Sequence, residues 1–202
     1  MKLLGSHTSP YARKVRLVLL EKNIPHEFIN DPPREPGSLS ARVNPLARIP
    51  ALILDDETCV FDSPVIAEYA DTLNDNAIMI PRDDARARMR VRRWEALADG
   101  MVDSAVVVRT ERIRPQEKQE EGNIQRNNDA ISHALEFAAS QLGDNEWCEG
   151  ATITLADLAL VSALMYLDLR QPERDWRSQH PNLAQWFARM SERQSVKTSI
   201  AS

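Results

Sequence analysis

Residues 44–54 read Asn-Pro-Leu-Ala-Arg-Ile-Pro-Ala-Leu-Ile-Leu, and this stretch decides the fold. The run Ala51–Leu54 is short and apolar, which predicts a strand, and Pro50 stands directly before it. If the bond between Ile49 and Pro50 is cis, the N–H and C=O of Ile49 turn away from the sheet toward a cleft. A peptide-like ligand can then pair with them as a strand would. If the bond is trans, Pro50 begins an edge strand.

Upstream of this stretch the pattern is strand, helix, strand. Met1–Ser6 is a short apolar start that contains Gly5 near its end, which predicts a strand. Ser9 followed by Pro10 is a favoured helix start, and helical spacing of apolar residues continues until Pro25. His26–Asn30 alternates apolar and polar residues, which predicts a second strand.

Ser9 has two compatible interpretations. A serine in this position caps a helix through its hydroxyl. The same hydroxyl lies beside free backbone N–H groups and the positive end of the helix dipole, where an anion such as a thiolate is stabilised.

Downstream, Cys59–Phe61 is a second short strand, joined to Ala51–Leu54 by an acidic turn, so the two predict a hairpin. A helix follows from Ser63 to Leu73. We expect Ser63 to cap it, with Pro64 in its first turn. The free N–H groups there suit a carboxylate, and the side chain of Asp62 suits an ammonium group, so the pair can bind an amino-acid end. A plain helix cap is the alternative.

The rest of the chain is predicted to be helical. Ile78–Asp84 is a linker, and Thr154 with Asp157 forms the Ser/Thr-x-x-acid pattern of a capping box. We therefore predict two domains, residues 1–77 and 85–202. The expected helices of the second domain are Ala85–Arg112, Glu120–Leu142, Thr154–Leu169 and Asn182–Arg193.

Composition narrows the class of protein. The chain has 202 residues, 43% of them hydrophobic, with a net charge of −5. Neither the part before residue 80 nor the part after it is basic, which argues against nucleic acid as a partner. No apolar run reaches the roughly 20 residues that span a bilayer, and no signal peptide is recognisable. Two cysteines form no disulfide framework, so we expect a cytoplasmic protein without a membrane partner.

Four short motifs, taken in order, resemble the glutathione transferase family, and the chain looks like a small bacterial-type member. Each motif is weak by itself, but their order and spacing along the whole chain are specific. The motifs span residues 9–16 (Ser-Pro-Tyr-Ala-Arg-Lys-Val-Arg), 44–52, 62–69 (Asp-Ser-Pro-Val-Ile-Ala-Glu-Tyr) and 154–157 (Thr-Leu-Ala-Asp).

The resemblance implies an α/β thioredoxin-like N-terminal domain, an all-α C-terminal domain, a cis Ile49–Pro50 bond and glutathione as cosubstrate. It assigns the backbone of Ile49 to the cysteinyl part of glutathione, and Asp62 and Ser63 to the γ-glutamyl end. Arg48 matches a position that often helps to hold the glycyl carboxylate. The family usually has Glu or Gln in place of Asp62.

The family activates its thiol with a Tyr, Ser or Cys near the first helix. No cysteine precedes residue 59, which argues against the glutaredoxin-like branches. Ser9 is the best match for the activating hydroxyl, with Thr8 and then Tyr11 as rivals. Lowering a thiol pKa by one unit needs only about 1.4 kcal/mol of preference for the thiolate, which one charge-assisted hydrogen bond supplies.

Two classes of function follow from the resemblance. The first is a detoxification enzyme, expected as a homodimer, that transfers glutathione to a small electrophile or uses it to reduce a peroxide. The second is a non-catalytic binding protein of the same fold with a protein partner. A third, narrower possibility is isomerisation of the maleylacetoacetate type, whose Ser-rich motif is not matched here.

Several other features are better explained as structural. The arginines between Arg82 and Arg93 are interpreted as a solvated helix face, balanced by Asp83, Asp84 and Glu95. The four tryptophans are expected to pack in the core. The histidines lack ligand spacing, so no metal site is predicted.

Overall fold

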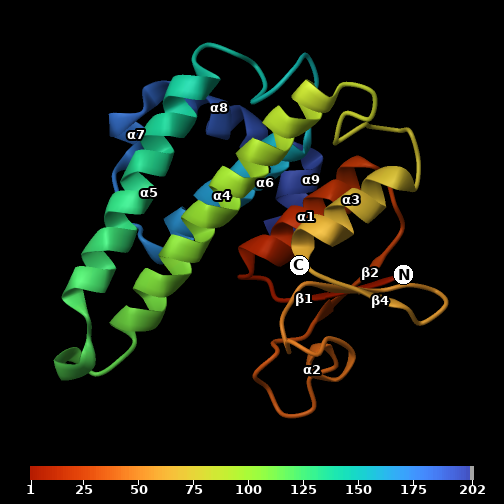
Figure 1. The fold of residues 1–202 in the computed structure, drawn as a ribbon, viewed down its shortest axis with the longest axis horizontal. Helices are drawn as coiled ribbons and strands as arrows, with labels where there is room; N and C mark the ends of the chain where they lie inside the picture. The colour runs from red at the N-terminus through yellow and green to blue at the C-terminus, as the bar shows by residue number, and fades with distance from the viewer. Residues whose placement is uncertain (201–202) are drawn as a thin grey trace.

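A four-stranded sheet forms the base of the first part of the chain, in the computed structural model that describes residues 1–200 (Figure 1). Its strand order is β2-β1-β3-β4. β1 pairs in parallel with β2, antiparallel with β3, and β3 pairs antiparallel with β4, which confirms the predicted hairpin. The strands are β1 (Lys2–Gly5), β2 (Glu27–Asn30), β3 (Ala51–Ile53) and β4 (Cys59–Val60).

Two helices, α1 (Pro10–Glu21) and α3 (Ser63–Thr72), cover one face of this sheet, and the short α2 (Ser40–Val43) lies on the other side (Figure 1). Strand residues alternate between faces, so Leu3 and Leu52 point into the helix-covered layer. They belong to one core cluster with apolar residues of both helices, among them Val15, Val18 and Ile66.

The second part is helical throughout, as predicted. α4 (Ala85–Arg112), α5 (Glu121–Leu142) and α6 (Leu155–Arg170) pack together, with α6 largely buried. The capping box is confirmed, because the carboxylate of Asp157 accepts the N–H of Thr154 at 2.8 Å. The remaining elements are the 3₁₀ turn η1 (Gln116–Lys118), α7 (Trp176–Gln179), α8 (Pro181–Ser191) and α9 (Gln194–Ile200).

The fold therefore matches the expected thioredoxin-like first part and all-helical second part. The long helices agree with the sequence prediction to within one or two residues, and α4 agrees at both ends. The short elements α2, η1, α7 and α9 were not predicted. No helix among residues 1–200 has the length and apolarity to cross a membrane.

The two parts share a continuous interface along α1. One side of α1 packs on α6 and is tied to α4 by side-chain bonds from Tyr11 and Lys14, and α9 returns from the end of the described chain to pack on α1 as well. Arg16 donates to the carbonyl of Ser199 at 3.3 Å, and Glu21 accepts a two-atom ion pair from Arg193. Helix α1 therefore has the apolar core below it and polar anchors on two flanks.

Candidate functional site

The topology brings the predicted site residues to one edge of the sheet. β1 ends at Gly5 on this edge, and the antiparallel β3 begins there because Leu4 pairs with Ala51. β4 runs antiparallel to β3 and ends on the same edge, since Leu52 pairs with Val60. Consequently Ser9, Pro50 and the Asp62–Ser63 pair all follow or precede strand ends that lie side by side, and α1 and α3 both begin there.

Ser9 is the N-cap of α1, as predicted. Its Oγ accepts the N–H of Ala12 at 3.2 Å, and its own N–H donates to the carbonyl of Ser6 at 3.0 Å. The preceding loop is fixed further by Arg13, whose guanidinium donates to the carbonyl of His7 at 2.9 Å. Because Oγ accepts the capping bond, its hydroxyl proton remains available to a ligand.

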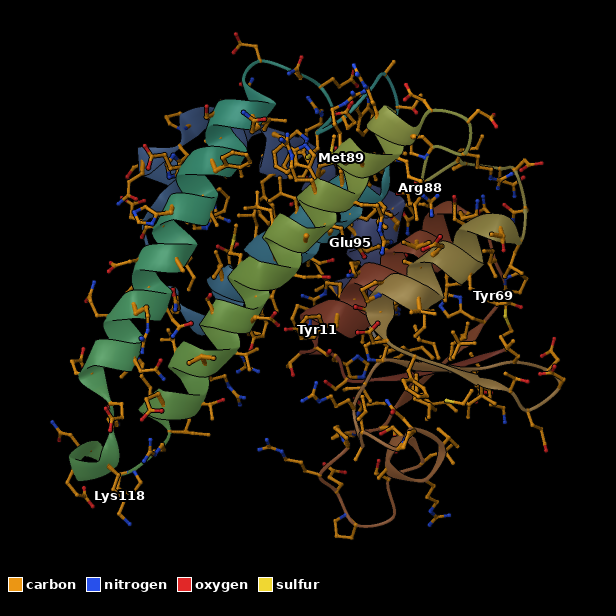
Figure 2. All side chains as sticks on the ribbon, viewed as in Figure 1. Tyr11, Tyr69, Arg88, Met89, Glu95 and Lys118 are labelled. Atoms are coloured by element: carbon orange, nitrogen blue, oxygen red, sulfur yellow. The ribbon has the colours of Figure 1, made fainter. Side chains whose placement is uncertain are left out.

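Of the two rival hydroxyls, that of Tyr11 already has a hydrogen-bond partner. Tyr11 donates its hydroxyl to the carboxylate of Asp103 on α4, on the side of α1 that faces the helical part (Figure 2). Burial and then the hydrogen bond to Asp103 raise the pKa of Tyr11 well above its usual value. That hydroxyl is committed to a carboxylate, which leaves Ser9 and the exposed Thr8 as candidate thiol partners.

The peptide bond between Ile49 and Pro50 is cis, as the resemblance implied. Pro50 is buried at the start of β3, whereas Ile49 is half-buried. Within residues 1–200 neither the N–H nor the C=O of Ile49 has a backbone partner. Most buried backbone groups are paired, so this open donor and acceptor at the sheet edge suit an extended ligand.

The loop before Ile49 is organised by Asn44, which is only 2% exposed. Its side chain donates to the carbonyl of Arg48 at 2.8 Å and accepts the N–H of Leu46 at 3.0 Å. Ala47 takes a positive φ of 48°, a conformation that favours glycine. The chain therefore keeps the left-handed turn at the position where the family usually has glycine, and the exposed side chain of Arg48 remains free to contact a ligand.

The predicted cap of α3 is wrong by one residue. The N-cap is Asp62, whose carbonyl accepts the N–H of Ile66 at 2.9 Å, and Ser63 is the first helical residue. The carboxylate of Asp62 makes no capping bond and is exposed. Both features suit ligand binding, because the helix N-terminus and a free carboxylate lie next to each other. The Phe61–Asp62 bond is also cis, which was not predicted.

The arginine-rich start of α4 is charge-balanced, but not mainly by the acids expected. Asp84 caps α4 by accepting the N–H groups of Arg86 and Ala87. The balancing partners come from several elements: Arg82 pairs with Asp75, Arg88 with Glu68, Arg90 with Glu149 and Arg92 with Glu95.

Sequence reasoning missed the polar residues between α1 and α4. Lys14 is almost fully buried and forms ion pairs with Glu95 and Asp99. Lysine is rarely buried, and a helical spacing of apolar residues does not reveal where a charged neighbour on the same helix points. Asp103 was missed for the same reason, because its role depends on a residue 92 positions away.

Comparisons with known proteins agree with this geometry. Residues 8–73 match the family model of the glutathione S-transferase N-terminal domain, and residues 121–189 match that of the C-terminal domain. The uncharacterised GST-like protein YibF of Escherichia coli is 38% identical over 195 residues, covering 96% of each chain.

Two solved structures are similar over nearly their whole length. A glutathione S-transferase of Methylobacillus flagellatus with glutathione bound is 42% identical, covers 98% of both chains and has a TM-score of 0.95. A family member from Pseudomonas fluorescens with bound S-(propanoic acid)-glutathione is 33% identical, covers 100% of this chain and 98% of its own, and has a TM-score of 0.87. The chain described here therefore belongs to the glutathione S-transferase family.

Proposed function

We propose that this protein binds glutathione at the sheet edge and transfers it to a small electrophile, or uses it to reduce a peroxide. The observation that carries the proposal is the unpaired backbone of Ile49 beside the first turns of α1 and α3. Glutathione is a peptide with carboxylates at both ends and an ammonium group at one. An open strand edge between two helix N-termini has the complementary chemistry.

Each end of glutathione has a candidate partner. The N–H and C=O of Ile49 pair with the cysteinyl residue, while Pro50 holds the strand start. The N-terminus of α3 at Ser63 binds the γ-glutamyl carboxylate, and the carboxylate of Asp62 binds the ammonium group. Arg48 binds the glycyl carboxylate. The Methylobacillus flagellatus relative contains bound glutathione, which supports this proposal.

Ser9 supplies the chemistry. Its hydroxyl donates to the sulfur of glutathione while its Oγ still accepts the N–H of Ala12, and the dipole of α1 adds a positive potential. Both effects favour the thiolate over the thiol. The thiolate then attacks an electrophilic carbon, forms the C–S bond and expels the leaving group with its electron pair.

We also propose that residues 1–77 form a glutathione-binding domain and residues 85–202 a helical domain. We propose a cytoplasmic location and a role in detoxification.

We further propose that the protein is a homodimer. Two large apolar side chains support an interface at α3 and α4: Val65 on α3 is 50% exposed, and Met89 on α4 is 53% exposed. Figure 2 labels Met89 on α4.

Two measurements test the function. In a thermal-shift assay, millimolar glutathione should raise the melting temperature, because a ligand that binds only the folded state stabilises it by about 2.7 kcal/mol at 100 times its Kd. The absence of any shift would contradict glutathione binding. Stabilisation without turnover on any electrophile or peroxide would instead indicate the non-catalytic binding protein.

A further inference from the structure

Arg170 is the last residue of α6, and its guanidinium has no hydrogen bond or ion pair with any residue of the described range 1–200. Its Nε is buried without a partner, and its guanidinium lies over the ring of Tyr166, 5.6 Å from the centroid. A guanidinium carries five N–H donors and stays charged, and a buried donor without an acceptor is costly. The guanidinium of Arg170 is therefore positioned by the ring of Tyr166, and its buried N–H group has no acceptor.

The direction of α6 places Arg170 near the start of α1. Both α1 and α6 contact the segment 77–79: Lys22, after the end of α1, donates to the carbonyl of Ala77 at 2.6 Å, and Leu155, at the start of α6, donates to that of Met79 at 3.0 Å. The two helices pack on each other, so they run antiparallel from this common level. The C-terminal end of α6 therefore lies beside the N-terminal end of α1.

Helix lengths then place Arg170 past the catalytic edge. Distances along the helix axes are measured from the common level at segment 77–79, with a rise of about 1.5 Å per residue. On this scale Pro10 lies about 17 Å from the end of α1, and Arg170 lies about 22 Å from the start of α6. Arg170 thus extends about one turn beyond the first turn of α1, where Ser9 lies. Tyr166, one turn earlier on α6, is close enough to Tyr11 to affect it electrostatically.

The acids that face the same region already have partners. Asp103 accepts the hydroxyl of Tyr11, and Asp99 is paired with Lys14. Within residues 1–200 no carboxylate pairs with the guanidinium of Arg170. A ligand bound there is the remaining source of an anion.

We propose that Arg170 is a specificity-determining residue that binds a carboxylate on the electrophile, so that the preferred substrates are small electrophilic acids. The proposal rests on the glutathione-transferase function above and names the substrate class of that site. The planar guanidinium suits two parallel hydrogen bonds to a carboxylate. With a haloacetate, the thiolate sulfur attacks the methylene carbon, the C–S bond forms, the carbon–halogen bond breaks and halide leaves with the electron pair.

The test compares two glutathione conjugates that differ in one group. S-(carboxymethyl)glutathione carries a carboxylate, and S-(carbamoylmethyl)glutathione carries a neutral amide of nearly the same shape. Calorimetric titration of the wild type should give about tenfold tighter binding of the acid, as expected for a charge-assisted bond. Arg170→Gln should bring this ratio close to one, and Arg170→Lys should retain part of the preference.

The matched control is Arg93→Gln. Arg93 also lies over an aromatic ring, that of Phe137 at 5.7 Å, but on the exposed side of α4 that faces α5. This variant should keep the full preference for the acid. Equal binding of the two conjugates by the wild type, or an unchanged ratio in Arg170→Gln, would overturn the inference. Titration with glutathione itself reports separately on the proposed function, because its binding does not require Arg170.

Discussion

The ammonium group of Lys14 lies 2.9 Å from the carboxylate of Glu95, and the two side chains are only 1% and 3% exposed. The same ammonium is 2.6 Å from Asp99, so one buried cation on α1 is shared by two acids on α4. Glu95 is visible on the face of α4 that turns toward α1 (Figure 2). This cluster holds the first turns of α1, including Ser9 and Tyr11, against the helical part of the molecule.

We therefore expect Lys14→Met to be strongly destabilising. The substitution leaves Glu95 and Asp99 close together without a counter-ion, and breaking a buried pair in this way costs about 3–5 kcal/mol. Urea denaturation of the wild type and the variant measures the loss. A loss below about 1 kcal/mol would show that the pair behaves like an exposed one.

The Lys14→Met penalty should also depend on pH. Burial already raises the pKa of Asp99, and the loss of Lys14 raises it further because Lys14 lowers it. A carboxyl whose pKa is raised by folding stabilises the fold at low pH and loses that contribution as pH rises through its folded-state pKa. The variant should thus lose less stability at about pH 5 than at about pH 7.5. Equal losses would contradict this.

Ser9→Ala should weaken catalysis and the fold separately. Removing the hydroxyl should raise the pKa of bound glutathione by about one unit, which lowers the thiolate fraction near neutral pH, and with it kcat/KM, about tenfold. The pKa is measured from the ultraviolet absorbance of the thiolate as a function of pH. The lost cap should also cost about 1 kcal/mol of stability.

Two variants serve as controls for Ser9. Tyr11→Phe breaks the hydrogen bond to Asp103 but should leave the thiol pKa unchanged, because that hydroxyl faces α4. Thr8→Ala should likewise keep most of the activity. Full activity in Ser9→Ala together with loss in Thr8→Ala would reassign the activating hydroxyl to Thr8.

Ala47→Gly should stabilise the protein. An L-residue at a φ of 48° costs about 1–2 kcal/mol of stability, and glycine removes this cost. Glycine also makes the unfolded chain more flexible, which lowers stability by about 0.4–1 kcal/mol. The net gain should be about 0.5–1 kcal/mol, seen as a higher midpoint of urea denaturation. Ala96→Gly on the exposed surface of α4 is the matched control and should lower stability by about 0.5–1 kcal/mol.

Glu21→Gln should loosen α9 in a pH-dependent way. Burial raises the pKa of Glu21, but hydrogen bonds from Arg193 and Ser195 outweigh it, so the pKa is lowered. A carboxyl with a lowered pKa stabilises the fold above its unfolded value of about 4.5, and this contribution is lost as pH falls through the folded value. The variant should be about 1–3 kcal/mol less stable near neutral pH. Denaturation curves of both proteins should converge in acid.

Local patterns in the sequence were enough to predict most of the fold. Ser9-Pro10 and the Thr154–Asp157 box are local signals with a physical cause, and they located the starts of α1 and α6 to within a residue, whereas α1 ends at Glu21, earlier than the expected stop at Pro25. The short α2 was missed because its start is stabilised by a residue outside the helix. The carboxylate of Asp31 accepts the N–H groups of Leu39 and Ser40, which lie 8 and 9 residues later in the chain.

The candidate site was predictable only where its residues follow strand or helix ends. Ile49 and Pro50 stand directly before a predicted strand, within a motif that resembles the family. The resemblance implied a cis bond between them, and the structure contains it. The cap at Ser63 was placed one residue too late, because Asp62 and Ser63 are both good capping residues. Arg170 gave no signal at all, since the absence of a partner is a property of three-dimensional packing.

The proposed glutathione site at one edge of the sheet is separate in sequence from the residue proposed to bind the electrophile. Every group proposed to hold glutathione lies between Ser9 and Ser63, whereas Arg170, proposed to bind the electrophile, lies at the end of α6. If Arg170 binds the electrophile as proposed, a substitution there changes the preferred electrophile and leaves the proposed hydrogen bonds to glutathione intact. On this proposal, the choice of electrophile depends on the helical part of the chain and the binding of glutathione on the first part.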